Sequence, residues 1–214
     1  MEQQFLYEIS YADRQQKALA YFEEIGVVVE TVIMSSDFAP KDVYSYARSA
    51  ALKGMHILAE RYLQQFHEIN PGLGIENYFQ IRIWPDEVPA GNKISFAEFL
   101  GTQYWPSLQV IEEASWGQMY NDENRGFVYA FLYPPYNIQD KNEGKLRSTL
   151  ISDYLYSVLG VDDICQVDHL TIFSWSDNWS NYFDNGKEWW GTFCWTIYNT
   201  QNNTVSFVAA STTD

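Results

Sequence analysis

Residues 168–199 form an aromatic stretch that constrains the fold more than any other part of the chain. Five of the eight tryptophans lie here, interleaved with acidic residues. The aromatic residues of the stretch include Phe173, Trp175, Trp179, Tyr182, Phe183, Trp189, Trp190, Phe193, Trp195 and Tyr198. Aromatic rings bury large apolar areas, whereas Trp and Tyr also carry a polar group that needs a partner. The stretch is therefore either the packed centre of the fold or a contact surface.

The length of 214 residues fits a single domain over 1–214, with a possible internal seam near 85–94, where Pro and Gly gather. No apolar run approaches the roughly 20 residues that cross a bilayer. The first residues lack the basic and apolar regions of a signal peptide, so we expect a cytoplasmic protein. Cys165 and Cys194 are both interpreted as free, buried thiols, in agreement with a reducing compartment.

The charge narrows the classes of partner. A formal net charge of −15 argues against nucleic acid and against an anionic membrane, because both require a basic face. After Arg147, eight acidic residues stand against Lys187 alone. Such an excess favours a basic protein as the partner. The alternative is that the acidity serves solubility alone.

Hydrophobic periodicity and turn residues predict the order of the elements. Helices are expected at 12–25, at 41–69 with Ser36 or Asp37 as its cap, at 96–101 with a capping box of Ser95 and Glu98, and at 145–159. Strands are expected at 4–10, 27–34, 77–84, 127–133, 169–175, 192–198 and 205–211, and at 108–114 with helix as the alternative. The order predicts an α+β fold, in which a mostly antiparallel sheet carries helices on one face and the C-terminal half is rich in strands.

The histidines offer little chemistry. On the long helix His56 and His67 lie roughly 16 Å apart at 1.5 Å per residue, too far for one metal ion. Asp168 and His169 are adjacent, and adjacent residues on a strand point to opposite faces, so Asp168 is not expected to orient His169 in a triad with Cys165. Since no catalytic motif is present either, the chain is interpreted as a binding protein rather than an enzyme, without a cofactor. A hydrolase site assembled from remote residues is left open as an alternative.

The loop between the last predicted strands is the best candidate site, because rigid aromatic anchors mixed with polar groups are typical of recognition surfaces. The predicted binding residues are Trp175, Asp177, Trp179, Tyr182, Asp184, Glu188 and Trp189. One interpretation keeps Trp190 and Trp195 in the core while Trp175, Trp179 and Tyr182 reach solvent; another makes the whole loop a plug of the core. Asp177, Asn181 and Asp184 lack the regular loop of a calcium site, so no metal is predicted.

These observations together predict an acidic protein that binds a basic protein. In its size, acidity and aromatic content the chain is similar to an immunity protein that neutralises a bacterial toxin, although the likeness covers no motif. The first alternative is a module that binds carbohydrate or another small ligand, with tryptophan rings that stack on sugars. The second is the hydrolase. The sequence assigns no oligomeric state.

Overall fold

The computed structural model describes residues 6–78, 80–88, 90–101, 108, 111, 116–121, 125–139 and 146–213. Within them, one antiparallel sheet has the strand order β1-β2-β6-β5-β4-β3. The strands are β1 (Tyr7–Glu8), β2 (Glu30–Ser35), β3 (Asn92–Ile94), β4 (Leu170–Ser174), β5 (Thr192–Asn199) and β6 (Thr204–Ser211). The helices are α1 (Asp13–Glu24), α2 (Val43–Ile69), α3 (Phe96–Leu100), α5 (Trp116–Tyr120), α6 (Phe127–Leu132) and α7 (Arg147–Tyr154), and α7 continues as a π-helical turn, η4 (Leu155–Leu159).

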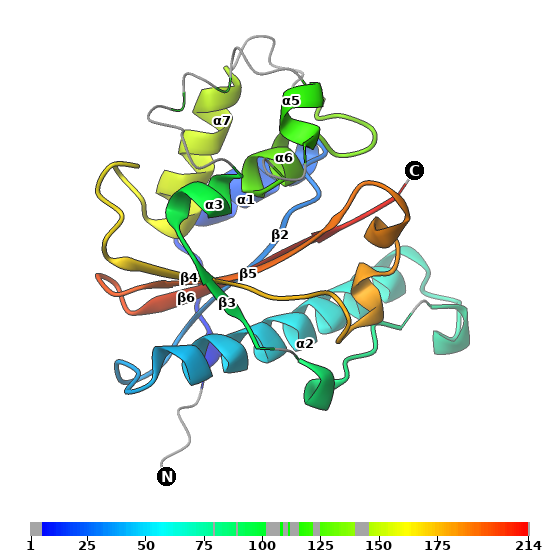
Figure 1. Ribbon diagram of the computed structural model, residues 1–214. Coiled ribbons are helices and arrows are strands. Elements are labelled where there is room, and N and C mark those ends of the chain that lie inside the picture. Colours follow the sequence, from blue (N-terminus) through cyan, green and yellow to red (C-terminus); the bar gives the residue numbers. More distant parts are fainter. Residues whose placement is uncertain are drawn as a thin grey trace.

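The predicted α+β class with an antiparallel sheet is confirmed. Helices lie on both faces of the sheet, however, and not on one as expected. Figure 1 shows α2 below the sheet and α1, α3, α5, α6 and α7 above it. Two separate hydrophobic clusters follow from this arrangement, one on each face.

The hairpin of β5 and β6 carries both clusters. Successive side chains of a strand point to opposite faces, so Phe193, Trp195 and Ile197 of β5 join the cluster under α6 and α7. Cys194 and Tyr198 join the cluster against α2. Because both faces are covered, the hairpin has no face toward solvent. The strands predicted at 192–198 and 205–211 are confirmed.

Helix α2 packs on β2, β5 and β6 through a stripe of small residues. Ala47, Ala50, Ala51 and Gly54 are buried along this stripe. Asp42 caps the helix by accepting a hydrogen bond from the Tyr44 N–H at 3.1 Å, so the predicted caps, Ser36 and Asp37, are wrong. The small side chains let the helix axis approach the sheet closely, which fixes α2 across the middle strands.

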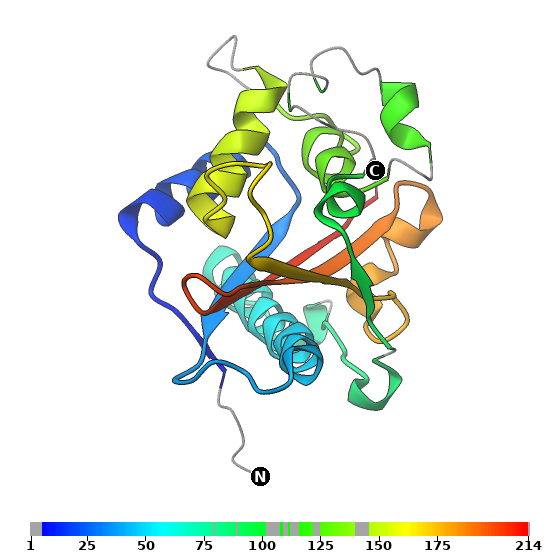
Figure 2. The ribbon, with the colours of Figure 1, turned by 60° about the vertical axis from the view of Figure 1, so that its left-hand side comes forward.

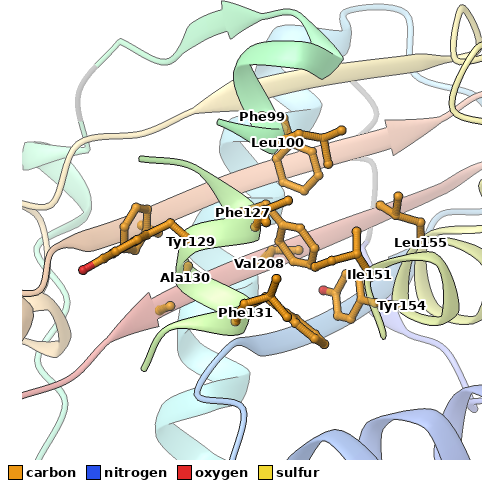
Figure 3. Close-up of a cluster of buried hydrophobic side chains, with 14 of the residues drawn as sticks. Phe99, Leu100, Phe127, Tyr129, Ala130, Phe131, Ile151, Tyr154, Leu155 and Val208 are labelled. Carbon is orange, nitrogen blue, oxygen red and sulfur yellow. The ribbon is translucent and has the colours of Figure 1, made fainter. Parts of the chain in front are cut away.

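Helix α6 is the clearest correction. Residues 127–133 were predicted as a strand, yet Phe127–Leu132 is helical and every residue in it is buried. Phe127 stacks on Phe99 of α3 with ring centroids 5.0 Å apart, and it lies 4.6 Å from the Tyr154 ring of α7. Figure 3 shows these rings meeting above Val208 of the sheet. A helix surrounded by core has no polar face, so it lacks the periodicity that identifies a helix in a sequence.

Other segments follow the predictions to different degrees. The capping box of Ser95 and Glu98 is confirmed at the start of α3. The predicted strand at 77–84 is wrong: a 3₁₀ turn (Ile75–Asn77) precedes it, and of the described residues only Ile83 forms a bridge, to Ser180. The segment 108–114 lies mostly outside the described residues. The segment 85–94, where we expected a seam, holds a 3₁₀ turn (Pro85–Glu87) and β3.

A polar cluster lies between α2, β1 and β2. The Tyr62 hydroxyl donates a hydrogen bond of 2.7 Å to Glu30. Arg61 forms an ion pair with Glu8 and donates to the Thr31 carbonyl at 3.0 Å. Burial raises the pKa of Glu30, an effect that the Tyr62 hydrogen bond and the Arg61 charge oppose only in part. Glu30 is therefore the acidic side chain in this cluster whose ionisation folding disfavours.

The close approach of α2 to the sheet predicts the effect of Gly54→Ala. A Cβ atom at this position would lie 2.4 Å from the Phe207 ring of β6. Alanine favours a helix by about 1 kcal/mol over glycine, whereas overpacking a core costs about 1–3 kcal/mol, so we expect a net loss of up to about 2 kcal/mol. Gly117→Ala in α5 is the matched control, since nothing lies within 4 Å of its Cβ position. Urea unfolding of both variants measures the difference, and equal stabilities would contradict the close packing.

The raised pKa of Glu30 predicts a dependence of stability on pH. A carboxyl whose pKa is raised by folding adds stability below its unfolded pKa, near 4.5, and this contribution is lost as the pH rises through the folded pKa. Glu30→Gln cannot ionise, so its melting temperature should exceed that of the wild type at pH 7–8, and the gain should disappear below pH 4.5. Glu60→Gln, at an exposed position of α2, should change the melting temperature little. A glutamine variant that is less stable than the wild type at pH 8 would contradict the assignment.

Candidate functional site

The aromatic stretch is mostly core. The exposed fractions are 5% for Trp175, 0% for Trp179, 8% for Tyr182, 0% for Trp190 and 5% for Trp195. The interpretation in which Trp175, Trp179 and Tyr182 reach solvent is therefore wrong. Trp189 differs from them, because 39% of its surface is exposed. One tryptophan of the predicted site is thus presented to solvent while its neighbour in the sequence, Trp190, is enclosed.

The buried indoles are held by hydrogen bonds as well as by packing. Their N–H groups donate from Trp175 to the Thr196 hydroxyl at 3.0 Å, from Trp179 to the Ser176 carbonyl at 2.7 Å and from Trp190 to the Tyr133 carbonyl at 2.6 Å. A buried polar group without a partner is costly, so these bonds make the packing of each ring specific. The loop between β4 and β5 is anchored by its tryptophans.

The described acidic residues from Asp162 onward fall into two groups at opposite ends of β4. Asp162, Asp163 and Asp168 are exposed before the strand, and Asp177, Asp184 and Glu188 follow it, with Asp177 partly buried. In Figure 1 the yellow loop before β4 and the orange loop after it lie on opposite sides of the molecule. The structure therefore does not bring these carboxylates onto one face, and only the second group lies near Trp189.

A hollow of about 520 Å³ lies beside this second group, and we call it the edge hollow. Its walls come from β3, α3, the end of β4, the loop after it and the start of β5. They include Ile94, Glu98, Arg125, Trp175, Asp177 and Trp189. Three of the seven predicted binding residues, Trp175, Asp177 and Trp189, thus share one concave surface, whereas Trp179, Tyr182, Asp184 and Glu188 do not line it.

The hollow lies where β4 leaves the sheet, because β4 ends before it has paired with the first residues of β5. The last strand pair is Ser174 with Trp195, followed by one hydrogen bond of 2.9 Å from the Trp175 N–H to the Cys194 carbonyl. Strand β5 continues to Thr192, which pairs with Ser211 of β6 on its other side. Figure 2 shows β3 and the orange loop flanking this end of the sheet. The missing length of β4 leaves a gap in the sheet that the edge hollow occupies.

Charged groups of both signs line the hollow, and each of them already makes at least one contact within the protein. Asp177 accepts a hydrogen bond of 2.8 Å from the Thr192 hydroxyl. The Ser95 N–H donates to Glu98 and lowers the pKa of that carboxyl. The Arg125 guanidinium lies 4.0 Å above the Tyr120 ring and donates to the Trp189 carbonyl at 3.3 Å, and Lys187 pairs with Asp184 at 3.2 Å.

Like Glu98, whose Oε2 atom accepts from the Ser95 N–H, Asp177 retains free acceptor capacity in the hollow. Its Oδ2 atom holds Thr192, and no donor among the described residues contacts its Oδ1 atom. An ionised carboxylate accepts several hydrogen bonds, so a ligand can supply the remaining ones. The arrangement suits a cationic donor that also contacts the face of an aromatic ring.

The structure gives the other candidate residues separate roles. Burial raises the pKa of the Cys194 thiol well above its usual range, which keeps it protonated and unreactive. Cys165 was also expected to be buried, but it is exposed, so that prediction is wrong. His169 lies at the far end of β4, where its carbonyl accepts from Thr200. Asn181 bonds the main chain at Gln80 and Arg82, so it does not join Asp177 around a cation. The described residues contain no cluster of His, Cys, Asp and Glu fit to hold a metal ion.

Comparison with known proteins supplies no relative: no protein-family model, no curated protein and no solved structure matches the chain. Among the described helices, none combines the length and the apolar character that a bilayer span requires. The function must therefore be argued from the geometry of the chain.

The sequence did not identify Glu98, Arg125 and Ile94 as part of the site. Glu98 was correctly predicted as part of the capping box of α3, but not as a residue of the site. Arg125 lies outside every predicted helix and strand, far in sequence from the aromatic stretch. No signal in the sequence brings these residues together, because the contact depends on β3 pairing with β4 at the edge of the sheet.

The contrast between Trp189 and Trp190 predicts two different effects of truncation. Trp190→Ala removes a fully buried ring and its hydrogen bond to Tyr133, so we expect a loss of about 3–5 kcal/mol in the free energy of unfolding. Trp189→Ala should cost about 1 kcal/mol or less, since the ring is 39% exposed. Denaturant unfolding of both variants measures this difference. Similar losses would mean that the two rings are buried alike.

Proposed function

We propose that the chain is a binding protein for a basic protein, and that the edge hollow receives a cationic side chain of that partner. The observation that carries the proposal is the position of Asp177 in a hollow lined by the Trp175 and Trp189 rings. A guanidinium or an ammonium group bound there gains a charge-assisted hydrogen bond from the carboxylate and a cation–π contact from an indole.

Two observations favour a protein side chain as the ligand of the hollow. The net charge of −15 attracts a basic macromolecule over a distance and raises its rate of association. Exposed Trp189 stands at the rim, and tryptophan is enriched among the residues that dominate protein interfaces. Inhibition of such a partner, as by an immunity protein, is the form of this function that the sequence suggests, and its toxin-like identity remains part of the proposal.

Binding of a small ligand is the second candidate. The volume of about 520 Å³ falls within the range of about 300–1,000 Å³ that is usual for small-molecule sites. A neutral sugar would use the Trp189 face and the hydroxyl-binding oxygens of Asp177. It would bind without dependence on salt, whereas a cationic side chain loses affinity as ionic strength screens the charges.

An array of blocked heptapeptides with a central arginine and varied flanks tests the proposal against the same array with citrulline in place of arginine. Citrulline keeps the shape of the side chain and removes its charge. The best arginine peptides should bind about tenfold or more tightly than their citrulline counterparts, a difference of about 1.4 kcal/mol, and should weaken with salt. Tryptophan fluorescence titration gives the affinities, and a neutral oligosaccharide titrated in parallel tests the second candidate.

Variants of the protein locate the binding. Asp177→Asn should abolish the preference for arginine over citrulline, and Trp189→Ala should weaken both. Trp84→Ala is the matched control, because Trp84 is also 39% exposed but does not line the hollow. The proposal fails if the arrays show no preference for arginine, or if Asp177→Asn keeps that preference.

A further inference from the structure

We propose that the partner segment binds in an extended conformation and hydrogen-bonds the main chain of Thr192, so that it takes the place that β4 vacates. This inference rests on the proposed function and specifies how the same hollow recognises its partner. It follows from the register of the sheet, which determines where the main-chain groups of β5 point.

The register identifies the open groups. In an antiparallel pair, alternate residues of a strand direct both their N–H and C=O groups toward the same neighbour. The Cys194 carbonyl accepts from Trp175, so Cys194 faces β4, and Phe193, one residue earlier, faces β6. By the same alternation Thr192 directs its N–H and C=O toward the β4 side. Strand pairing there stops at Ser174, and among the described residues no main-chain group takes up these two.

The walls of the hollow show that the gap is a slot through the edge of the sheet. Trp175 and Cys194 belong to the cluster on the α2 face, whereas Phe193 and Trp195 belong to the opposite cluster. All four residues line the same hollow. A space bounded by residues from both faces lies in the plane of the sheet, where a strand fits. Asp177 accepts from the Thr192 side chain and leaves the main chain of Thr192 open to a ligand.

Strand addition also sets the order of side chains in the partner. Side chains of an added strand alternate between the two faces of the sheet. The Thr192 side chain, which bonds Asp177, lies on the same face as Cys194, so a partner residue on the α2 side meets Asp177. Its immediate neighbours point toward the side of Phe193 and of Arg125, which lies over the Tyr129 ring. Asp177 favours a cation at the first position, whereas Glu98 and Arg125 both line the other side of the hollow, so that side selects no single sign of charge. The partner motif is therefore an extended segment with an arginine or lysine at the position that meets Asp177.

N-methylation of the peptide tests the main-chain contact. In the tightest arginine heptapeptide of the array, each backbone amide is methylated in turn, which removes one donor and leaves every side chain in place. Methylation at the residue opposite Thr192 should lower the affinity by roughly fivefold, the usual effect of one neutral hydrogen bond, while methylation of its two neighbours should have little effect. On the protein, amide hydrogen exchange of Thr192 should slow when the peptide binds, and that of Phe193, which already pairs with Ala210, should not change.

The outcomes separate the two proposals. If the preference for arginine and its loss in Asp177→Asn hold, but the methylation scan is flat and Thr192 exchange is unchanged, the hollow binds a cation without strand addition and this inference is wrong. Equal losses at consecutive amides would also contradict an extended strand, since they would indicate a helical or a nonspecific mode. If no arginine peptide binds, the proposed function fails and the inference fails with it.

Discussion

The structure depends on a β-hairpin that is buried on both faces. Strands β5 and β6 direct side chains alternately toward α2 and toward the helices on the other side, so every position between Phe193 and Ala210 on the strands must pack against something. Two helical layers are needed to cover such a sheet. The small-residue stripe of α2 and the enclosed aromatic helix α6 meet the same requirement from opposite sides. The aromatic stretch is rich in tryptophan because it supplies the sheet's core on both faces.

The candidate site arises where this double cover ends. Strand β4 stops at Ser174, while β5 extends three residues beyond the last paired residue, Trp195, as far as Thr192. Main-chain groups at that end need partners that the core does not provide, and polar side chains gather around them: Asp177 bonds the Thr192 hydroxyl. The loop after β4 is held in place by buried indoles, so the carboxylate is presented from a rigid base. A preorganised group binds at a lower entropic cost than one that must be ordered on binding.

The sequence predicts those parts of this arrangement that local chemistry determines. The capping box of Ser95 and Glu98 and the hairpin of β5 and β6 depend on neighbouring residues, and both were predicted correctly. Phe127–Leu132 was not, because a short apolar run fits a buried strand and a buried helix equally well until its surroundings are known. The exposure of Trp175 and Trp179 depends on how far β4 extends, which no local pattern encodes. For the same reason Glu98 and Arg125 could not be assigned to the site.

The charge acts differently at long and at short range. Since the acidic residues before and after β4 lie at opposite ends of the strand, they do not form one docking face. Their combined field still draws a cationic partner, but a field of this kind falls off within about 8–10 Å at physiological salt and gives no register. Register must come from directional contacts, and the edge hollow offers two kinds: the Asp177 carboxylate and the main chain of Thr192. Attraction by the whole surface and recognition at one gap in the sheet are thus separate properties, and only the second depends on where β4 ends.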